Sequence, residues 1–205
     1  TPPAPDLAGL SSLQPLLAAD AKIQVAEQYP FQPLHAARIA LTQTGKLGTI
    51  SQVQLSVAHG YHGISLIRHL LGIQFENAAI SAHEYSTPLV VGTDRDGHPP
   101  VSEQIQASRQ VIATLDFGNK FAIYDFCGEQ YHSWIRAPRV LVRGERGEIT
   151  DTHVRYLQDF QMPLMLELQR QDTGQNGNLE GYYHRGIIAG ETWLYSNPFP
   201  FARLN

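Results

Sequence analysis

Histidines and glycines gather in one short stretch, Ala58 to Gly72, which reads AHGYHGISLIRHLLG. His59 and His62 are spaced like a pair of metal ligands, although a mononuclear site also needs a third and a fourth ligand. Ser65 has no nucleophile elbow around it, which argues against a serine hydrolase. His62 could instead transfer a proton, because imidazole titrates close to neutral pH. Ordinary polar histidines without a chemical role are the alternative interpretation.

Four residues elsewhere in the chain could join a site around His62 once the chain folds. Each of them alone is more commonly a solvated or hydrogen-bonded group. They are Glu27, Asp125, Glu129 and His132. The chain has neither a Gly-x-Gly-x-x-Gly turn nor a P-loop, so its sequence contains no recognisable cradle for phosphates.

The elements around the histidines are predicted by a change of hydrophobic period. Before Gly60, apolar Val53, Leu55 and Val57 alternate with polar residues, which is the period of a half-buried strand. After Gly60 the apolar residues follow a helical period and leave the histidines on the polar side. A strand that ends in a flexible glycine and continues as a helix commonly carries ligand-binding side chains. We therefore expect the site at this junction.

The remaining pattern predicts an α+β fold, with a large, mostly antiparallel open sheet and helices on one face. Helices are expected at Leu7–Ala19 and Phe31–Thr44, and a short strand at Lys22–Glu27. The second half is rich in β-branched and aromatic residues. Its expected strands are Phe75–Val91, Gln104–Phe117, Lys120–Phe126, Tyr131–Arg136, Val140–Arg143, Glu148–Leu157 and Gly186–Tyr195, and a polar loop is expected at Gln171–Leu179.

Composition narrows the class of protein. The 205 residues are 42% hydrophobic, which is enough for one full core. A net charge of −4 without a basic cluster argues against nucleic acid as a partner. No apolar run is long enough for a membrane helix, and the first residues lack the features of a signal peptide, so we expect a cytoplasmic protein. Cys127 is the only cysteine, and its apolar surroundings predict a buried thiol.

The residues from Ala26 to Gly72 resemble a known family. The stretch AEQYPFQPLHAARIALTQTGKLGTISQVQLSVAHGYHGISLIRHLLG is similar to the start of the C-terminal domain in the glucose-fructose oxidoreductase, inositol dehydrogenase and rhizopine-catabolism (Gfo/Idh/MocA) family. The later VLVRGERGEIT, at Val140–Thr150, is similar to a glycine-rich hairpin of that family. The resemblance covers most of the chain.

The chain departs from the family pattern at the catalytic positions. In this register His62 matches the family histidine and Gly60 the family glycine. Ala58 and Ser65 stand where the family has aspartates, and Thr1 stands where it has a lysine. The resemblance thus leaves His62 as the one catalytic position that still has a group for acid or base chemistry. His59, Tyr61 and Ser65 are the expected substrate-binding neighbours.

The resemblance implies a division of the chain and three possible functions. Residues 1–32 would be the last helix and strand of a truncated dinucleotide-binding domain, and residues 33–205 a C-terminal domain for substrate binding and oligomerisation. The first function is part of an oxidoreductase that uses NAD or NADP in the full-length parent and acts on a sugar, polyol or similar small molecule. The second is a binding or assembly module that has lost catalysis. The third is a metal-assisted enzyme built on His59 and His62.

A homo-oligomer is expected to form through the sheet. Aromatic residues recur in the neighbouring strands predicted on either side of the turn at Gly118-Asn119, and we expect them on the outer face, where a second copy would cover them. These residues are Phe117, Phe121, Tyr124 and Phe126. Neither a membrane nor a nucleic acid is expected as a partner, and no dinucleotide is expected to bind this chain by itself.

Overall fold

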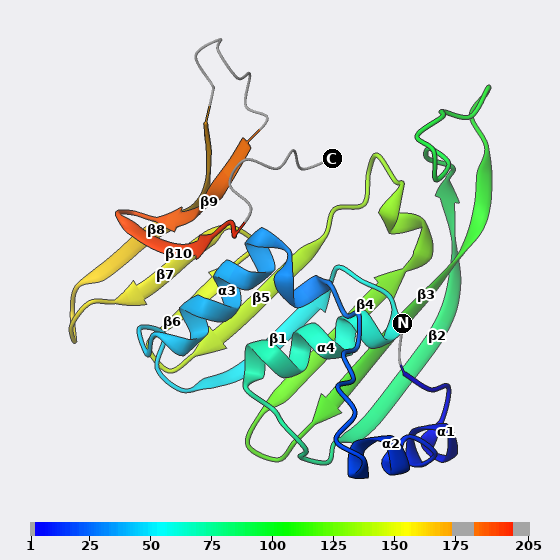
Figure 1. The fold of residues 1–205 in the computed structure, drawn as a ribbon. Coiled ribbons are helices and arrows are strands. Elements are labelled where there is room, and N and C mark those ends of the chain that lie inside the picture. Colours follow the sequence, from blue (N-terminus) through cyan, green and yellow to red (C-terminus); the bar gives the residue numbers. More distant parts are fainter. Residues whose placement is uncertain (1–2, 174–182, 199–205) are drawn as a thin grey trace.

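The computed structural model describes residues 3–173 and 183–198, and within them ten strands form one sheet (Figure 1). Their order across the sheet is β10-β9-β8-β7-β6-β5-β1-β4-β3-β2. All neighbouring pairs are antiparallel except β1 and β4, which run parallel. The strands are β1 (Ile50–Ser56), β2 (Ala79–Val90), β3 (Ile105–Asp116), β4 (Phe121–Cys127), β5 (Arg139–Gly144), β6 (Gly147–Thr150), β7 (His153–Leu157), β8 (Pro163–Thr173), β9 (Tyr183–Ala189) and β10 (Thr192–Ser196). The predicted α+β class with a mostly antiparallel sheet is confirmed.

Two helices, α3 (Pro33–Gln43) and α4 (Gly60–Leu71), lie on one face of the sheet (Figure 1). Proline at the first position of α3 is favourable because that residue needs no hydrogen-bond donor. Gly72 ends α4 in the left-handed conformation, with φ of 66°, which glycine adopts without strain. α3 also contacts β9 and β10, so this end of the sheet curls around the helix (Figure 1).

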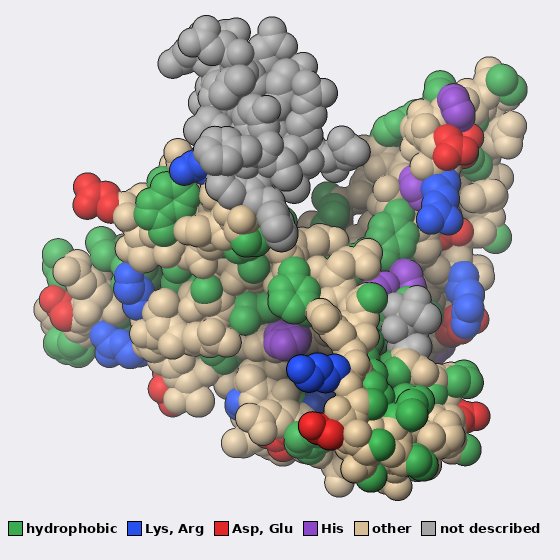
Figure 2. Space-filling model, in the orientation of Figure 1, with side chains coloured by type: hydrophobic (Ala, Val, Ile, Leu, Met, Phe, Trp, Pro, Cys, Tyr) green, Lys and Arg blue, Asp and Glu red, His purple; other side chains and the backbone are tan. Residues whose placement is uncertain are grey.

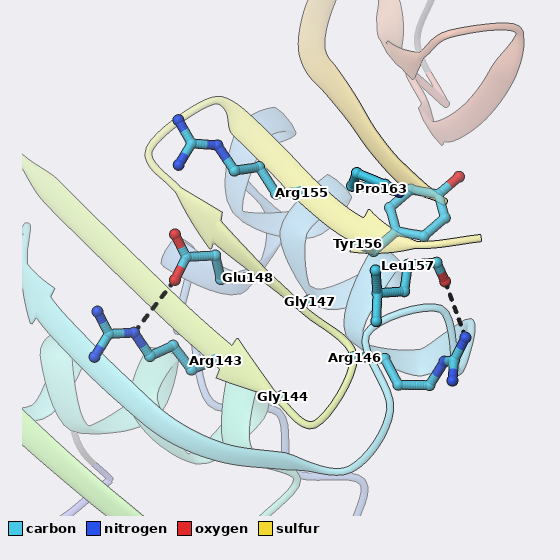
Figure 3. A pocket seen from close by; sticks show the side chains of 9 residues that line it. All are labelled: Arg143, Gly144, Arg146, Gly147, Glu148, Arg155, Tyr156, Leu157 and Pro163. Atoms are coloured by element: carbon cyan, nitrogen blue, oxygen red, sulfur yellow. Dashed lines mark hydrogen bonds and ion pairs between the residues drawn. The ribbon is translucent and has the colours of Figure 1, made fainter. Parts of the chain in front are cut away.

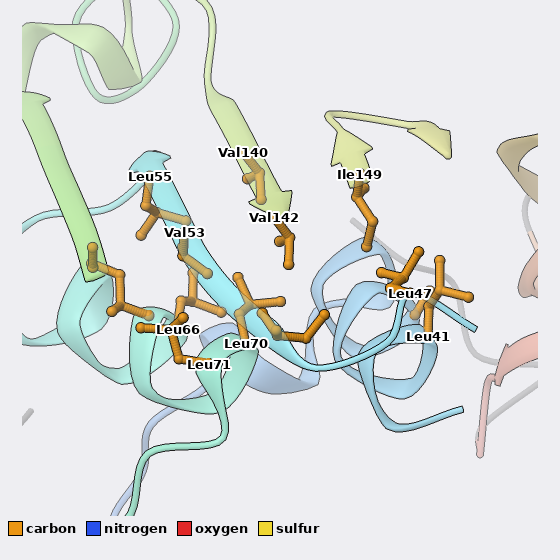
Figure 4. Close-up of a cluster of buried hydrophobic side chains, with 14 of the residues drawn as sticks. Leu41, Leu47, Val53, Leu55, Leu66, Leu70, Leu71, Val140, Val142 and Ile149 are labelled. Carbon is orange, nitrogen blue, oxygen red and sulfur yellow. The ribbon is translucent and has the colours of Figure 1, made fainter. Parts of the chain in front are cut away.

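The core lies between these helices and the sheet (Figure 4). Its side chains are the alternate, inward-facing residues of the central strands together with the apolar stripe of α4, as the periods of two and 3.6 require. The most deeply buried members include Leu47, Val53, Leu55, Leu66, Ile67, Leu70, Val142 and Ile149. Cys127 is buried, as expected.

The prediction that the four aromatic residues share the outer face is wrong. Leu55 of β1 pairs with Tyr124 of β4, so both face the core, and Phe126 follows on the same side. Phe117 is partly buried against the core. Phe121 remains on the outer face and is 37% exposed. Side chains alternate along a strand, and Phe121 therefore has to face away from Tyr124 and Phe126.

The outer face of the central strands carries charged residues that pair across strands. Arg139 of β5 contacts Asp125 of β4 at 2.7 Å, and Arg143 of β5 contacts Glu148 of β6 at 3.3 Å. Cross-strand pairs of opposite charge stabilise a sheet modestly. This face is thus mixed in character, because it carries both the exposed Phe121 and the ion pairs.

The N-terminal segment differs from its predicted form. The expected helix at Leu7–Ala19 is two short helices, α1 (Leu7–Ser11) and α2 (Gln14–Ala18), and neither has a buried residue. Lys22–Glu27 does not form a strand. An isolated stretch needs a neighbouring strand for its hydrogen bonds, and the described part of the chain offers none beside it.

Several other elements also differ from their predicted boundaries. The expected strand at Tyr131–Arg136 is replaced by the 3-10 helix η2 (Gly128–Tyr131) and irregular chain, while a second 3-10 helix, η1 (Tyr29–Phe31), precedes α3. Asp151, with φ of 54°, forms a turn that divides Glu148–Leu157 into β6 and β7. A similar turn separates β9 from β10. Most of the predicted polar loop at 171–179 lies outside the described residues. Among the described helices, none is long and apolar enough to cross a membrane.

Candidate functional site

The histidines lie at the junction between β1 and α4, as the sequence predicts, but the prediction that they share the polar side of the helix is wrong for His62. His62 is buried on the same side as Leu66, whereas His69 is exposed. β1 ends at Ser56, and Ala58 is fully buried. His59 precedes the helix in an extended conformation, and Gly60 opens it with φ of 40°, a value that favours glycine. His62 then lies in the first turn of α4 and is 6% exposed.

Two tyrosine hydroxyls occupy the N-terminal end of α4. The first backbone N–H groups of a helix have no partner within the helix and are commonly capped by a side chain. Here the N–H of His59 donates to the hydroxyl of Tyr131 at 3.0 Å, and the N–H of Gly60 donates to the hydroxyl of Tyr124 at 2.8 Å. Burial raises the pKa of Tyr124 above its usual value. Both hydroxyls thus serve as caps.

Gly63 allows the Tyr124 ring to approach the helix. A Cβ atom at Gly63 would lie 2.6 Å from a ring carbon of Tyr124 and 2.8 Å from the carbonyl oxygen of Ala58. Both separations are shorter than any relaxed contact, so glycine is required here by the packing of β4 on α4.

His62 is held by a carboxylate from the N-terminal segment. Its Nδ1 lies 2.6 Å from Oε2 of Glu27, and the other carboxylate oxygen of Glu27 accepts the backbone N–H of Tyr29 at 2.9 Å. The Tyr29 ring packs on the imidazole with centroids 4.5 Å apart, and its hydroxyl lies 3.2 Å from that of Tyr131. Burial, and then the contact with Tyr131, raise the pKa of Tyr29 above its usual value.

This arrangement fixes the tautomer of a neutral His62. An ionised carboxylate can only accept hydrogen bonds, so Nδ1 carries the proton and Nε2 presents its lone pair. Nε2 of His62 makes no hydrogen bond to a described residue. This atom is not fully buried, so it keeps contact with solvent. An imidazole oriented in this way is suited to accept a proton from a hydroxyl group.

Three of the four predicted site residues lie together. The ring centroid of His62 is 4.9 Å from that of His59 and 4.2 Å from that of Tyr61. Ser65 is half-buried one turn further along α4, and its hydroxyl makes no hydrogen bond to any described residue. His59 is itself fixed by Tyr131, whose hydroxyl lies 2.9 Å from Nδ1.

Of the four additional candidates, Glu27 joins the cluster. Asp125 instead pairs with Arg139 on the outer face, and Glu129 accepts a hydrogen bond from Ser108 at 2.7 Å. The His132 ring is tilted by 58° against the ring of Tyr131, with centroids 6.4 Å apart. Tyr61 was predicted, but three further tyrosines of the site were not, because nothing in their local sequence distinguishes them. They are Tyr29, Tyr124 and Tyr131.

Metal ligation receives no support at the histidine pair. No third ligand atom of the described residues lies close enough to those of His59 and His62 to form a group of three. Among the described residues, the one group with three ligand atoms close enough for a metal ion is exposed on a turn far along the chain. Its members are Asp94, Asp96 and His98.

A shallow pocket of about 350 Å³ lies elsewhere, on β5 to β7 (Figure 3). Arg143 and Glu148 form an ion pair at its edge, and Arg146 donates to the carbonyl oxygen of Leu157 at 3.2 Å. None of the residues of the His62 cluster lines this pocket. Its arginines are therefore unconnected with the chemistry of His62.

No family model and no curated protein matches the sequence. Several solved structures match the fold. An oxidoreductase from Agrobacterium radiobacter, in complex with NAD+, L-tartaric acid and magnesium, gives a TM-score of 0.52 with 17% identity over 80% of this chain and 52% of that one. A protein from Magnetospirillum magnetotacticum assigned as an oxidoreductase gives 0.50 with 17% identity over 92% and 57%. An inositol dehydrogenase homolog from Azotobacter vinelandii gives 0.46 with 14% identity over 78% and 46%.

The first two matches establish the fold. The chain has the α+β fold of the C-terminal domain of Gfo/Idh/MocA-like oxidoreductases, as the resemblance in its sequence predicts. It spans about half the length of the structures that it matches.

Proposed function

We propose that this chain is the substrate-side portion of an NAD(P)-dependent oxidoreductase that acts on a sugar, polyol or similar small molecule, with His62 as its acid or base. In this proposal residues 1–32 belong to a dinucleotide-binding domain and residues 33–205 form the substrate-binding domain. The observation that carries it is the pair between His62 and Glu27 at 2.6 Å, located at the strand-to-helix junction.

His62 and Glu27 together can accept a proton from a substrate hydroxyl group and later return it. A substrate hydroxyl next to Nε2 of His62 would give up its proton to that atom, while Nδ1 keeps its proton in the hydrogen bond to Glu27. The resulting imidazolium is stabilised by the carboxylate, as in other carboxylate-histidine pairs. Reversal of the step returns the proton to an alkoxide. His59, Tyr61 and Ser65 are proposed to contact the substrate around this point.

The N-terminus of α4 is not available for a dinucleotide. Pyrophosphate is usually held by free N–H groups at a helix N-terminus that follows a glycine-rich turn. At α4 the N–H groups of His59 and Gly60 are already bonded to tyrosine hydroxyls. NAD or NADP in the full-length parent would be held by residues outside this chain, and calorimetry of this chain with either dinucleotide should give no heat of binding.

The N-terminal segment supports the proposed division of the chain. Leucines of α1 and α2 are exposed, and Figure 2 shows apolar side chains gathered over these helices. Exposed apolar patches of this kind commonly mark an interface. A covering domain would bury Leu7, Leu10, Leu16 and Leu17.

A homo-oligomer through the outer face of the sheet is part of the same proposal. The outer face carries exposed apolar side chains, namely Phe121, Tyr85 and Met165. The charged pairs on the same face would fix the register of a symmetric contact between two copies. Light scattering at high micromolar concentration should give at least a dimer. A monomer there would remove this part of the proposal. We also place the parent protein in the cytoplasm, and the single cysteine of this chain, which is a buried free thiol, is in keeping with that proposal.

The second candidate function is a binding module without turnover. It is favoured by Ala58, which is fully buried and offers no carboxylate where the family has one. Titration of the full-length parent with NAD and NADP separates the two functions, because a parent that binds neither can only be the module.

The test of catalysis is His62→Gln in the full-length parent, assayed with sugars and polyols. Loss of a general base should lower turnover by about 100-fold or more. Glu27→Gln should also shift the pH profile of turnover, because the amide no longer fixes the tautomer. His69→Gln, an exposed histidine of the same helix, is the matched control. Unchanged turnover in His62→Gln would refute the assignment.

A further inference from the structure

A second pocket, of about 820 Å³, lies between the start of α3 and the strands β5, β8 and β9. This size is typical of sites for small organic molecules. None of Glu27, His59, Tyr61 and His62 lines it, so it is separate from the site described above. Its apolar walls come from Leu34, Val57, Pro138, Val140, Leu168 and Ile187.

Arg38 brings a buried positive charge to this pocket. The side chain belongs to α3 and is 6% exposed. Its Nε donates to the carbonyl oxygen of Asp151 at 2.9 Å, and its Nη1 donates to Nδ1 of His35 at 3.1 Å. No carboxylate of the described chain lies within ion-pair distance of the guanidinium. A buried cation without an ionic partner is costly, and an anion in the pocket would offset that cost.

His184 of β9 adds an unpaired polar atom. The residue is 1% exposed and lines the pocket, and its Nε2 has no hydrogen-bond partner. Its Nδ1 lies 3.0 Å from Oδ1 of Asp172, which also accepts from Nε of Arg170 at 2.8 Å. Burial acts to raise the pKa of Asp172, but the hydrogen bonds from Arg170 and His184 hold it below its usual value.

Because Asp172 is ionised, it fixes the tautomer of a neutral His184. Nδ1 donates to the carboxylate, and Nε2 is left as an unpaired acceptor on a side chain that lines the pocket. A buried polar atom in this condition lacks the hydrogen bond that almost all such atoms make. A ligand with an O–H or N–H donor would supply it.

The charged groups of the lining are Arg38, Arg170 and Asp151. Arg170 is already paired with Asp172 at 2.8 Å, so Arg38 is the cation of the lining that has no ion pair with a described residue. One carboxylate oxygen of Asp151 is occupied by the N–H of Val140 at 2.8 Å. We propose that this pocket binds a small organic monoanion, a carboxylate with an apolar body and a hydroxyl group. Its carboxylate pairs with Arg38, and its hydroxyl donates to Nε2 of His184.

Three probes test the two contacts separately. 4-Hydroxyphenylacetate carries both groups, 4-hydroxyphenylacetamide lacks the charge, and phenylacetate lacks the hydroxyl. Binding to the purified chain is measured by calorimetry and by the ¹⁵N signals of the histidine rings. We expect 4-hydroxyphenylacetate to bind about tenfold or more tightly than the amide, because a charge-assisted hydrogen bond is lost. It should also move the ring signal of His184.

Variants assign each preference to a residue. Arg38→Gln should remove the preference for the carboxylate over the amide, whereas Arg38→Lys should keep much of it. His184→Phe has a ring of similar size and should remove the preference for the hydroxylated acid. Arg155→Gln, an exposed arginine of the other pocket, is the control and should leave all three affinities unchanged.

The His184 signal keeps the test decisive where a variant fails to fold. The proposal is overturned if none of the probes moves that signal in the unmodified chain at millimolar concentration. It is equally overturned if all three probes bind with the same affinity, since that outcome reports apolar contact alone.

Discussion

His35 should make the fold sensitive to mild acid, and replacing it with asparagine should remove that sensitivity. The imidazole lies on α3 with 6% exposure, and its Nδ1 accepts a hydrogen bond from the buried Arg38. Burial, and then the charge of Arg38, lower the pKa of His35 from 6.5 to about 4. His35→Asn places an amide oxygen near the position of Nδ1, so it can keep the hydrogen bond to Arg38 without titrating.

The sign of the effect follows from proton linkage. Above pH 6.5 His35 is neutral in both the folded and the unfolded chain. The difference between its pKa in the two states then has no effect on the free energy of unfolding. Below pH 6.5 the unfolded chain binds a proton that the folded chain excludes, so the free energy of unfolding falls as the pH falls. This loss of unfolding free energy is nearly complete at pH 4, where the folded chain also begins to bind the proton. It amounts to about 3 kcal/mol, because one pKa unit corresponds to about 1.4 kcal/mol.

Urea denaturation at several pH values between 6.5 and 4 measures this effect. The unmodified chain should lose about 3 kcal/mol more than His35→Asn across this range. Acidic groups with lowered pKa values, such as Asp172 and Glu84, contribute equally to both proteins and cancel in the difference. His69→Asn, an exposed histidine on α4, should retain the acid sensitivity of the unmodified chain.

A parallel pair of curves would refute this reasoning. If His35→Asn and the unmodified chain lose the same free energy between pH 6.5 and pH 4, then the folded chain admits a proton at His35 as easily as the unfolded chain. A constant offset between two parallel curves reports only lost packing, which does not depend on pH, and it does not rescue the reasoning.

Three further changes test the packing of α4. Gly63→Ala should lower the free energy of unfolding by about 1 to 3 kcal/mol, because the new Cβ would meet the Tyr124 ring and the Ala58 carbonyl, and an unchanged urea midpoint would contradict this contact. Tyr124→Phe removes the hydroxyl that caps the N–H of Gly60 and should cost about 1 kcal/mol by thermal denaturation; no change would mean that water replaces the cap. Leu66→Ala removes a fully buried side chain and should cost about 2 to 5 kcal/mol in urea, whereas a cost below that range would indicate that the core collapses into the space.

The sequence by itself determined the local features of the site. The change of period at Gly60 located the end of β1 and the start of α4, and the helical stripe identified the face of α4 that enters the core. These features depend on neighbours within a few positions, so periodicity is sufficient to predict them. The same pattern predicted the α+β class and the hairpin at Gly118, where φ is 88°.

The wrong prediction that the four aromatic residues share one face could have been avoided from the sequence alone. Phe121 and Tyr124 are an odd number of positions apart in one strand, so alternation alone requires them to face opposite sides. Which side is buried was decided by the pairing of β4 with β1, because Leu55 and Tyr124 lie opposite one another beneath α4.

Only the tertiary structure decided which residues surround His62. Glu27 is 35 positions away in sequence, and Tyr131 is 72 positions from His59. These contacts depend on strand order and on how the helices pack, and neither is encoded in the local pattern around the residues concerned. The pocket with Arg38 and His184 has the same origin, because α3 and β9 meet only after β8 to β10 curl around the helix.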